Sequence, residues 1–114
     1  MSNTKKLGRL KKRSEFLYVR DGKYRAIGGV VIQMRENPKN NGEIRVGFTA
    51  TKKIGNAVTR NKAKRRLRAC AQTCLPEFGK PDHDYVFIAR DGTVTRNFED
   101  LKEDVKKALL TLAR

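Results

Sequence analysis

The chain has 114 residues, and its 27 Lys and Arg against 12 Asp and Glu give a formal net charge of +15. This length predicts a single domain over residues 1–114, and 38% hydrophobic residues suffice for one core. No apolar run approaches the roughly 18 residues of a membrane span, and no apolar segment follows the basic N-terminus, so neither a transmembrane helix nor a secretory signal is predicted. Such a charge favours nucleic acid as the partner, ahead of an anionic membrane surface, and we expect a cytoplasmic location.

The N-terminal segment predicts an arm followed by a short helix. Residues 1–13 are polar and basic without periodicity, which indicates a flexible basic arm. Ser14 can cap a helix over residues 15–20, which ends at the following turn. Phe16 lies in this helix among cations, so it is either a core residue or an aromatic exposed to stack on single-stranded nucleic acid.

Two strands are predicted next. Residues 26–35 alternate between apolar and polar side chains late in the run, and Gly28-Gly29 at its start indicates a bulge. Residues 43–51 alternate throughout, and their second face is small and polar, open to solvent or to a ligand. We expect these strands to pair as an antiparallel hairpin across a turn at residues 37–42.

The stretch 52–68 contains eight cations and no acid. Gly55-Asn56 predicts a turn before a helix over about residues 58–74, which Pro76 would end. At about 100° per residue, most of the cations fall beside one apolar stripe. The stripe consists of Ala63, Leu67, Cys70, Ala71 and Cys74. A merely solvated helix usually mixes charge signs, so this face favours docking to a polyanion, and the helix N-terminus adds amides that bind phosphate.

The C-terminal part completes an α+β sandwich. Cys70 and Cys74 are predicted to be reduced core residues, and residues 85–89 are apolar on both faces, which is typical of an interior strand. Asn97 can cap a last amphipathic helix. Its apolar stripe consists of Phe98, Leu101, Val105, Ala108, Leu109 and Leu112. The expected fold has three helices on one sheet of about four strands.

The sequence offers little chemistry of its own. Asp82, His83 and Asp84 could form a metal or acid–base cluster, but a polar turn leading into a strand is the favoured interpretation. The sequence lacks a Gly-rich phosphate loop and a carboxylate pair set to shift two pKa values apart. We therefore predict a binding protein that contributes neither catalytic nor metal-ligating residues.

From Arg45 onward, the sequence RVGFTATKKIGNAVTRNKAKRRLRA closely resembles the signature of the protein subunit of bacterial ribonuclease P. The motif of that family is R-N-R-x-K-R-x-x-R after a K-K-x-G-x-A-V turn, and residues 60–68 read R-N-K-A-K-R-R-L-R. The LKKRSEF opening, the DYVFIAR strand and the terminal helix extend the resemblance over the whole chain. Lys62 stands where Arg is usual, so a bidentate phosphate contact there is in doubt.

The resemblance implies both a fold and a function. The fold is a ribosomal-protein-domain-like α/β sandwich with a mixed sheet and a left-handed β-α-β crossover around the basic helix, although the general rule for such crossovers is right-handed. The function is to assist a large catalytic RNA, which removes the 5′ leader of precursor tRNA with Mg²⁺ held mainly by the RNA. The protein and the RNA would form a heterodimeric ribonucleoprotein in which the protein breaks no bond.

By position, the resemblance also assigns residues to two binding sites. The residues for the catalytic RNA are Arg60, Asn61, Lys62, Lys64, Arg65 and Arg68. The residues for the precursor tRNA leader are Lys12, Phe16, Thr49, Thr51, Lys52, Lys53 and Arg90. Arg20 and Gln33 stand where some members have further leader aromatics, so leader binding would depend less on stacking and more on charge.

Two alternatives stay open at this point. A ribosomal protein or RNA chaperone would suit the same composition and the same basic helix. A metal-dependent nuclease using Asp82, His83 and Asp84 is the other alternative, and cleavage by the protein without RNA would support it.

Overall fold

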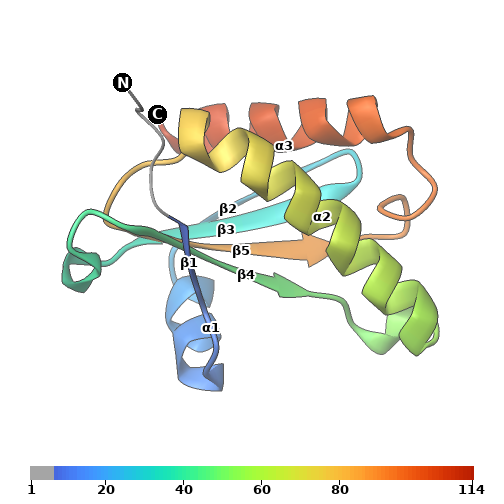
Figure 1. The fold of residues 1–114 in the computed structure, drawn as a ribbon, viewed down its shortest axis with the longest axis horizontal. Coiled ribbons are helices and arrows are strands. Elements are labelled where there is room, and N and C mark those ends of the chain that lie inside the picture. Colours follow the sequence, from blue (N-terminus) through green and yellow to red (C-terminus); the bar gives the residue numbers. More distant parts are fainter. Residues whose placement is uncertain (1–6) are drawn as a thin grey trace.

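A computed structural model describes residues 7–114, and residues 1–6 of the arm expected over residues 1–13 lie outside the described residues. The strands are β1 (Leu7–Arg9), β2 (Lys23–Ile27), β3 (Val30–Glu36), β4 (Ile44–Thr49) and β5 (His83–Ala89). The helices are α1 (Arg13–Arg20), α2 (Ala57–Phe78) and α3 (Phe98–Leu112), with short 3-10 turns at Pro38–Asn40 and Lys52–Ile54. The helices α2 and α3 cover one face of the sheet and α1 lies on the other, so the fold is an α+β sandwich (Figure 1).

The described strands form one mixed sheet with the order β1-β4-β5-β3-β2. Strand β5 lies at its centre, parallel to β4 and antiparallel to β3, which confirms the expected interior strand at residues 85–89. The expected hairpin between residues 26–35 and 43–51 is wrong, because β5 lies between β3 and β4. A strand that is apolar on both faces must be covered on both, and only a central position provides this.

Two local predictions also change the number of strands from about four to five. Gly28-Gly29 forms the tight turn of the β2–β3 hairpin rather than a bulge, since Ile27 pairs with Val30 and Gly28 has a φ of 53°. Leu7–Arg9, expected to belong to the arm, pairs in parallel with Ile44–Val46 of β4 as the edge strand β1. Short edge strands carry few apolar residues, which is why the pattern did not reveal it.

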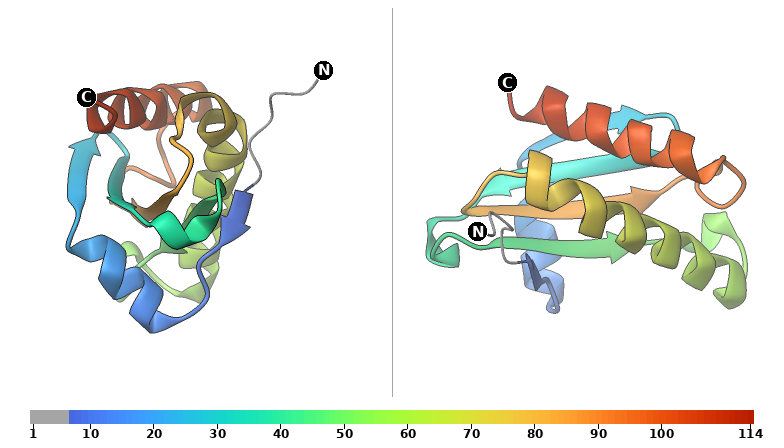
Figure 2. Two further views of the ribbon diagram at one scale, coloured as in Figure 1. Left: turned by 90° about the vertical axis from the view of Figure 1, so that its left-hand side faces the viewer. Right: turned by 45° about the horizontal axis from the view of Figure 1, so that its top comes forward.

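The crossover β4–α2–β5 is left-handed. Both strands point to the right in Figure 1 with α2 above them, and β5 lies behind β4. The end-on view in Figure 2 shows the same order of the strands from β1 to β2. The handedness implied by the family resemblance is therefore found, and the general right-handed preference does not hold here.

The main core lies between the sheet and the two helices α2 and α3. The predicted apolar stripe of α2 is buried throughout, and so is that of α3 except for the half-buried Phe98. Cys70 and Cys74 are free and buried, and burial raises the pKa of Cys70 to about 12, as befits inert core thiols. No described helix is long and apolar enough to cross a membrane.

The ends of two helices differ from the prediction. Helix α1 begins at Arg13 with Lys12 as its N-cap residue, rather than at a Ser14 cap, because the Glu15 carboxylate accepts the N–H groups of Lys11 and Lys12. Helix α2 continues through Pro76 to Phe78. Proline has no backbone N–H, so Pro76 removes one hydrogen bond of the helix. This loss falls in the last turn, where few further hydrogen bonds of the helix follow.

Candidate nucleic-acid interface

Helix α2 presents the basic residues on its outward side. Asn56 caps the helix, since its side chain accepts the Thr59 N–H at 2.9 Å, and the buried stripe turns the helix onto the sheet. Four of the sequence-predicted residues, Asn61, Lys62, Arg65 and Arg68, are exposed, while Arg60 and Lys64 are half-buried at the border of the stripe. The structure therefore brings these six residues together on one helix.

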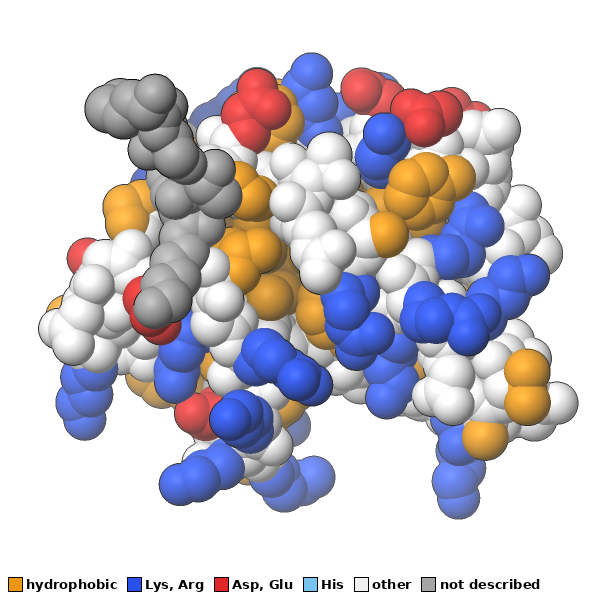
Figure 3. Space-filling view, in the orientation of Figure 1, with side chains coloured by type: hydrophobic (Ala, Val, Ile, Leu, Met, Phe, Trp, Pro, Cys, Tyr) orange, Lys and Arg blue, Asp and Glu red, His pale blue; other side chains and the backbone are white. Residues whose placement is uncertain are grey.

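The positive charge of these residues is not compensated by ion pairs with acids among the described residues. In the described part of the chain, the acids that form ion pairs are Glu15, Asp84, Glu99 and Asp104, and their partners are Arg45, Arg96 and Lys102. No cation of the six-residue set pairs with any of them. Figure 3 shows Lys and Arg side chains gathered over α2 and below it, while several acidic side chains lie toward α3 at the top. Such a one-signed surface requires counterions or a polyanion.

Arg66 and Arg60 are anchored by the protein itself. Arg66 turns toward α3, where its guanidinium lies 5.7 Å from the Phe98 ring centroid and donates to the carbonyl of Arg96. Arg60 Nη1 donates to the Gly55 carbonyl at 3.0 Å, next to the helix entry. Arg66 thus has a packing role, whereas Arg60 is held toward the start of α2.

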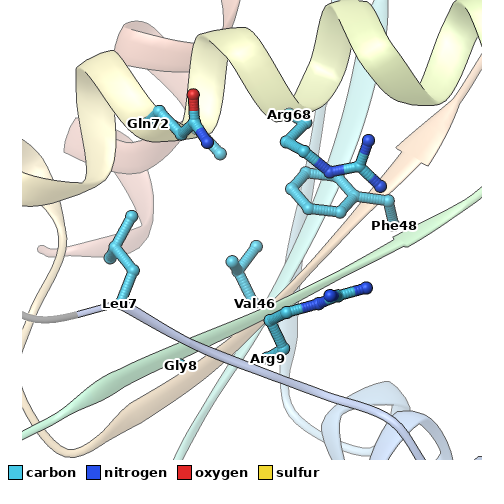
Figure 4. Close-up of a pocket in the computed structure, with 8 residues that line it drawn as sticks. Leu7, Gly8, Arg9, Val46, Phe48, Arg68 and Gln72 are labelled. Carbon is cyan, nitrogen blue, oxygen red and sulfur yellow. The ribbon is translucent and has the colours of Figure 1, made fainter.

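A groove of about 510 Å³ runs between β1, β4 and α2 (Figure 4). The Arg68 guanidinium lies 5.3 Å from the centroid of the Phe48 ring, and the Gln72 amide extends from the next turn of α2 toward the groove. Arg9 approaches from β1 on the opposite wall, and Val46 forms the floor. The guanidinium of Arg68 is therefore held by an aromatic ring rather than by an acid.

Phe16 stands on the other face of the sheet, beside the same strand. Its ring lies so close to Gly47 that a Cβ on that glycine would be 2.6 Å from it. Phe16 is only partly buried, and it shares a surface hollow of about 340 Å³ with Lys11, Arg13, Phe48 and Thr49. One part of the Phe16 ring therefore packs on the sheet and another part is accessible, so its accessibility permits stacking but does not establish it.

The two sets of predicted residues meet at the outer edge of β4. Strand β1 ends at Arg9, so no described strand covers this edge beyond Val46. A further hollow of about 150 Å³ opens there, lined by Phe16 from α1 and by Lys64 and Arg68 from α2. Residues predicted to hold the leader and residues predicted to hold the catalytic RNA therefore border one continuous surface.

The remaining predicted leader residues are more dispersed. Lys12 is exposed at the N-cap of α1. Thr51, Lys52 and Lys53 are exposed between β4 and α2, near the C-terminal end of β4. Arg90 follows the C-terminal end of the parallel strand β5 and donates to the Gly28 carbonyl at 3.3 Å. Residues 51–53 and Arg90 thus follow the C-terminal ends of the parallel strands β4 and β5, whereas Lys12 lies apart on α1.

Sequence reasoning missed an ion-pair network that fixes α1 on the sheet. Arg45 of β4 donates to both oxygens of the buried Asp84, at 3.0 and 2.8 Å, and to Glu15 of α1 at 3.0 Å. Burial alone would raise the pKa of Asp84, but hydrogen bonds from Arg45, Asn37 and Asn40 hold it below its usual value. The parallel pairing of Arg45 with Asp84 was the missing signal, since the sequence predicted a different neighbour for β4.

Replacing Asp84 with asparagine should therefore remove an acid-sensitive part of the stability. A carboxyl group with a lowered pKa stabilises the fold above its unfolded-state pKa of about 3.9, and this contribution disappears as the pH falls through the lower folded-state value. We expect Asp84→Asn to lower the free energy of unfolding by about 2 kcal/mol at pH 7, and by less in strong acid. Urea unfolding across this pH range measures both values, with the exposed Asp91→Asn as control; an equal loss at every pH would contradict the network's role.

The alternative cluster of Asp82, His83 and Asp84 does not converge on a common point. Asp82 accepts the Gly42 N–H at 2.7 Å, and a ring nitrogen of His83 lies 2.9 Å from the Pro81 carbonyl. Asp84 is engaged with Arg45. Within residues 7–114, no three His, Cys, Asp or Glu side chains are grouped to hold a metal ion. These residues serve the turn and the sheet, as the favoured interpretation predicted.

The sequence is similar to those of known proteins along almost its whole length. The sequence model of the family described as Ribonuclease P matches residues 4–113. The ribonuclease P protein component of Caulobacter vibrioides is 53% identical over 111 residues, covering 97% of this chain and 74% of the relative. That of Ruegeria pomeroyi is 46% identical over 105 residues, covering 90% and 84%.

Solved structures are similar in fold. A Staphylococcus aureus RNase P protein mutant with defective mRNA degradation activity superimposes with a TM-score of 0.78 at 25% identity, covering 92% of this chain and 87% of that one. The RNase P protein from Thermotoga maritima gives a TM-score of 0.74 at 26% identity, covering 90% and 96%.

Proposed function

Because the chain belongs to the family of ribonuclease P protein components, we propose that it binds the RNA of that enzyme through α2 and the leader of precursor tRNA through α1 and the sheet. Family membership makes it part of an endoribonuclease that processes tRNA, with an RNA partner in a ribonucleoprotein. The finer assignments are our proposal: one protein and one RNA per particle, acting on precursor tRNA in the cytoplasm.

The observation that carries the proposal is the uncompensated charge along α2. Folded RNA offers phosphates and 2′-hydroxyls to a protein, because its base edges lie in a deep, narrow groove. Exposed cations such as Arg65 and Arg68, on one rigid helix and free of acidic partners among the described residues, suit that chemistry. Each phosphate that they neutralise releases counterions, so the affinity should fall steeply with salt.

Phe16 and its neighbours suit a single strand instead. The accessible ring of Phe16 can stack a base, and the neighbouring cations Lys11 and Arg13 can neutralise the phosphates of the same strand. The network of Arg45, Glu15 and Asp84 holds α1 in place, which fixes the ring relative to the sheet. Leader and catalytic RNA would then be held on either side of the open edge of β4.

Bond cleavage is assigned to the RNA. Mg²⁺ prefers carboxylate and phosphate oxygens, and it would supply electrostatic stabilisation of the phosphodiester being cleaved. The described residues do not fit such an ion, since no three His, Cys, Asp or Glu side chains among them are grouped as a ligand set. We therefore assign Mg²⁺ to the RNA of the holoenzyme.

Reconstitution tests the proposal. Mixing the protein with ribonuclease P RNA at a low Mg²⁺ concentration should yield cleavage of precursor tRNA at the 5′ end of the mature tRNA, where neither component alone is active. A ribosomal protein or RNA chaperone would bind RNA without restoring cleavage, which would contradict the proposal. Cleavage by the protein alone, abolished in His83→Ala, would support the nuclease alternative instead.

A further inference from the structure

An exposed aromatic side chain lies on the outermost strand of the sheet. Tyr24 of β2 is 71% exposed, and it is the only aromatic among the exposed large apolar side chains of the described residues. Single exposed apolar residues are common on protein surfaces and need no explanation by themselves. The position of Tyr24 in the strand register is what gives it significance.

The register places Tyr24 on the same face of the sheet as Phe16. Tyr24 pairs with Gln33, Gln33 with Val86, and Val86 with Gly47, so the four residues form one row across the sheet. Paired residues point to the same face, and Val86 packs with residues of α1 while the Phe16 ring lies on Gly47. With strands about 4.8 Å apart, the two ends of this row are about 14 Å from each other.

The next row of the same face connects the two aromatic residues. It consists of Thr49, Ile88, Val31 and Ala26. Each of these four is half-buried or exposed, whereas Val86 in the first row is covered by α1. Thr49 shares the hollow of Phe16 at one end, and Ala26 lies two residues beyond Tyr24 at the other. An accessible strip of sheet therefore runs beside α1 from Phe16 to Tyr24.

A cation borders this strip where β5 ends. Arg90 follows Ile88 by two residues and is held beside the β2–β3 turn by its bond to the Gly28 carbonyl. The residues of the strip themselves include no acid.

We infer that Tyr24 is a second stacking site for a base of single-stranded RNA, farther along the leader than the base on Phe16. This inference rests on the proposed leader function. The register places Tyr24 directly across from Gln33 on the neighbouring strand. The span of about 14 Å exceeds the roughly 3.4 Å between stacked nucleotides severalfold, so only longer leaders reach Tyr24.

Leader length is therefore the variable to test. The reconstituted holoenzyme would be titrated with precursor tRNAs whose leaders grow by one nucleotide at a time, using the natural protein, Tyr24→Ala and Tyr24→Phe. We expect two increases in affinity with length, of which Tyr24→Ala removes only the second, about fivefold, while Tyr24→Phe keeps both. Binding of the shortest leaders should be the same for all three proteins.

Two results would overturn the inference alone: an unchanged second increase in Tyr24→Ala, or its loss in Tyr24→Phe, which would indicate the hydroxyl rather than the ring. If the natural holoenzyme gains no affinity from any leader, the leader proposal fails and this inference fails with it. Far-UV circular dichroism and thermal unfolding of the variants establish that the exposed substitution leaves the fold intact.

Discussion

Reversing the charge of Arg65 and Arg68 together should weaken assembly with ribonuclease P RNA on the order of a hundredfold at moderate salt. Both side chains are exposed on α2, and neither has an acidic partner in the described part of the chain. Glutamate at these positions removes the neutralisation of two phosphates and adds repulsion. The slope of log K against log salt should become shallower by about one for each phosphate that is no longer neutralised. Filter binding over a salt series measures both quantities.

A matched control separates position from net charge. Lys107 and Arg114 are exposed on and after α3, outside the set of six residues on α2. Their double replacement by glutamate changes the net charge by the same amount but should leave the affinity and the slope nearly unchanged. Equal losses of affinity in the two double variants would mean that α2 contributes only general charge. Arg65→Glu alone is a useful third variant, because Arg68 also packs on Phe48 and Arg65 does not.

Periodicity predicted the helices better than it predicted the sheet. The stripes of α2 and α3 were correct because an amphipathic pattern reports one helix against one core, which is a local property. Strand neighbours depend on which distant segment supplies the adjacent edge. The two alternating segments are typical of a hairpin, yet the doubly apolar β5 takes the place between them.

The left-handed crossover illustrates the same limit. Physical rules favour the right-handed connection, so only the family resemblance indicated the hand that the structure has. That resemblance also named the basic residues, and the fold places all six of them on α2. Their roles in binding RNA are predictions, which the charge-reversal variants test.

The sequence could not predict the relations that cross the sheet. The link between Arg45 and Asp84 and the row from Gly47 to Tyr24 both follow from β5 lying beside β4 and β3. By its sequence pattern, Tyr24 lies outside any predicted strand, since Gly28-Gly29 indicates a bulge there rather than the turn of a hairpin. A composition-based search would detect the cations but not this register.

Replacing Phe16 with alanine should weaken the binding of leader-bearing precursor by about 30-fold, with little change for mature tRNA. The accessible part of the ring can stack a leader base, and one such stack contributes roughly 1–3 kcal/mol. Measuring the affinity of the reconstituted holoenzyme for both RNAs gives the ratio directly. Similar losses of affinity for the two RNAs would indicate that Phe16 only packs.

Phe16 is also partly buried, so alanine could act by loosening α1 rather than by removing a stack. Phe16→Leu keeps an apolar side chain near Leu10 and Val86 but has no ring, and it should lower the leader affinity about as much as alanine does while retaining most of the stability. Gly47→Ala approaches the question from the strand, because its Cβ would collide with the ring and displace it. If Phe16→Leu kept full leader affinity, the side chain would be acting through packing, and the stacking role would have to be abandoned.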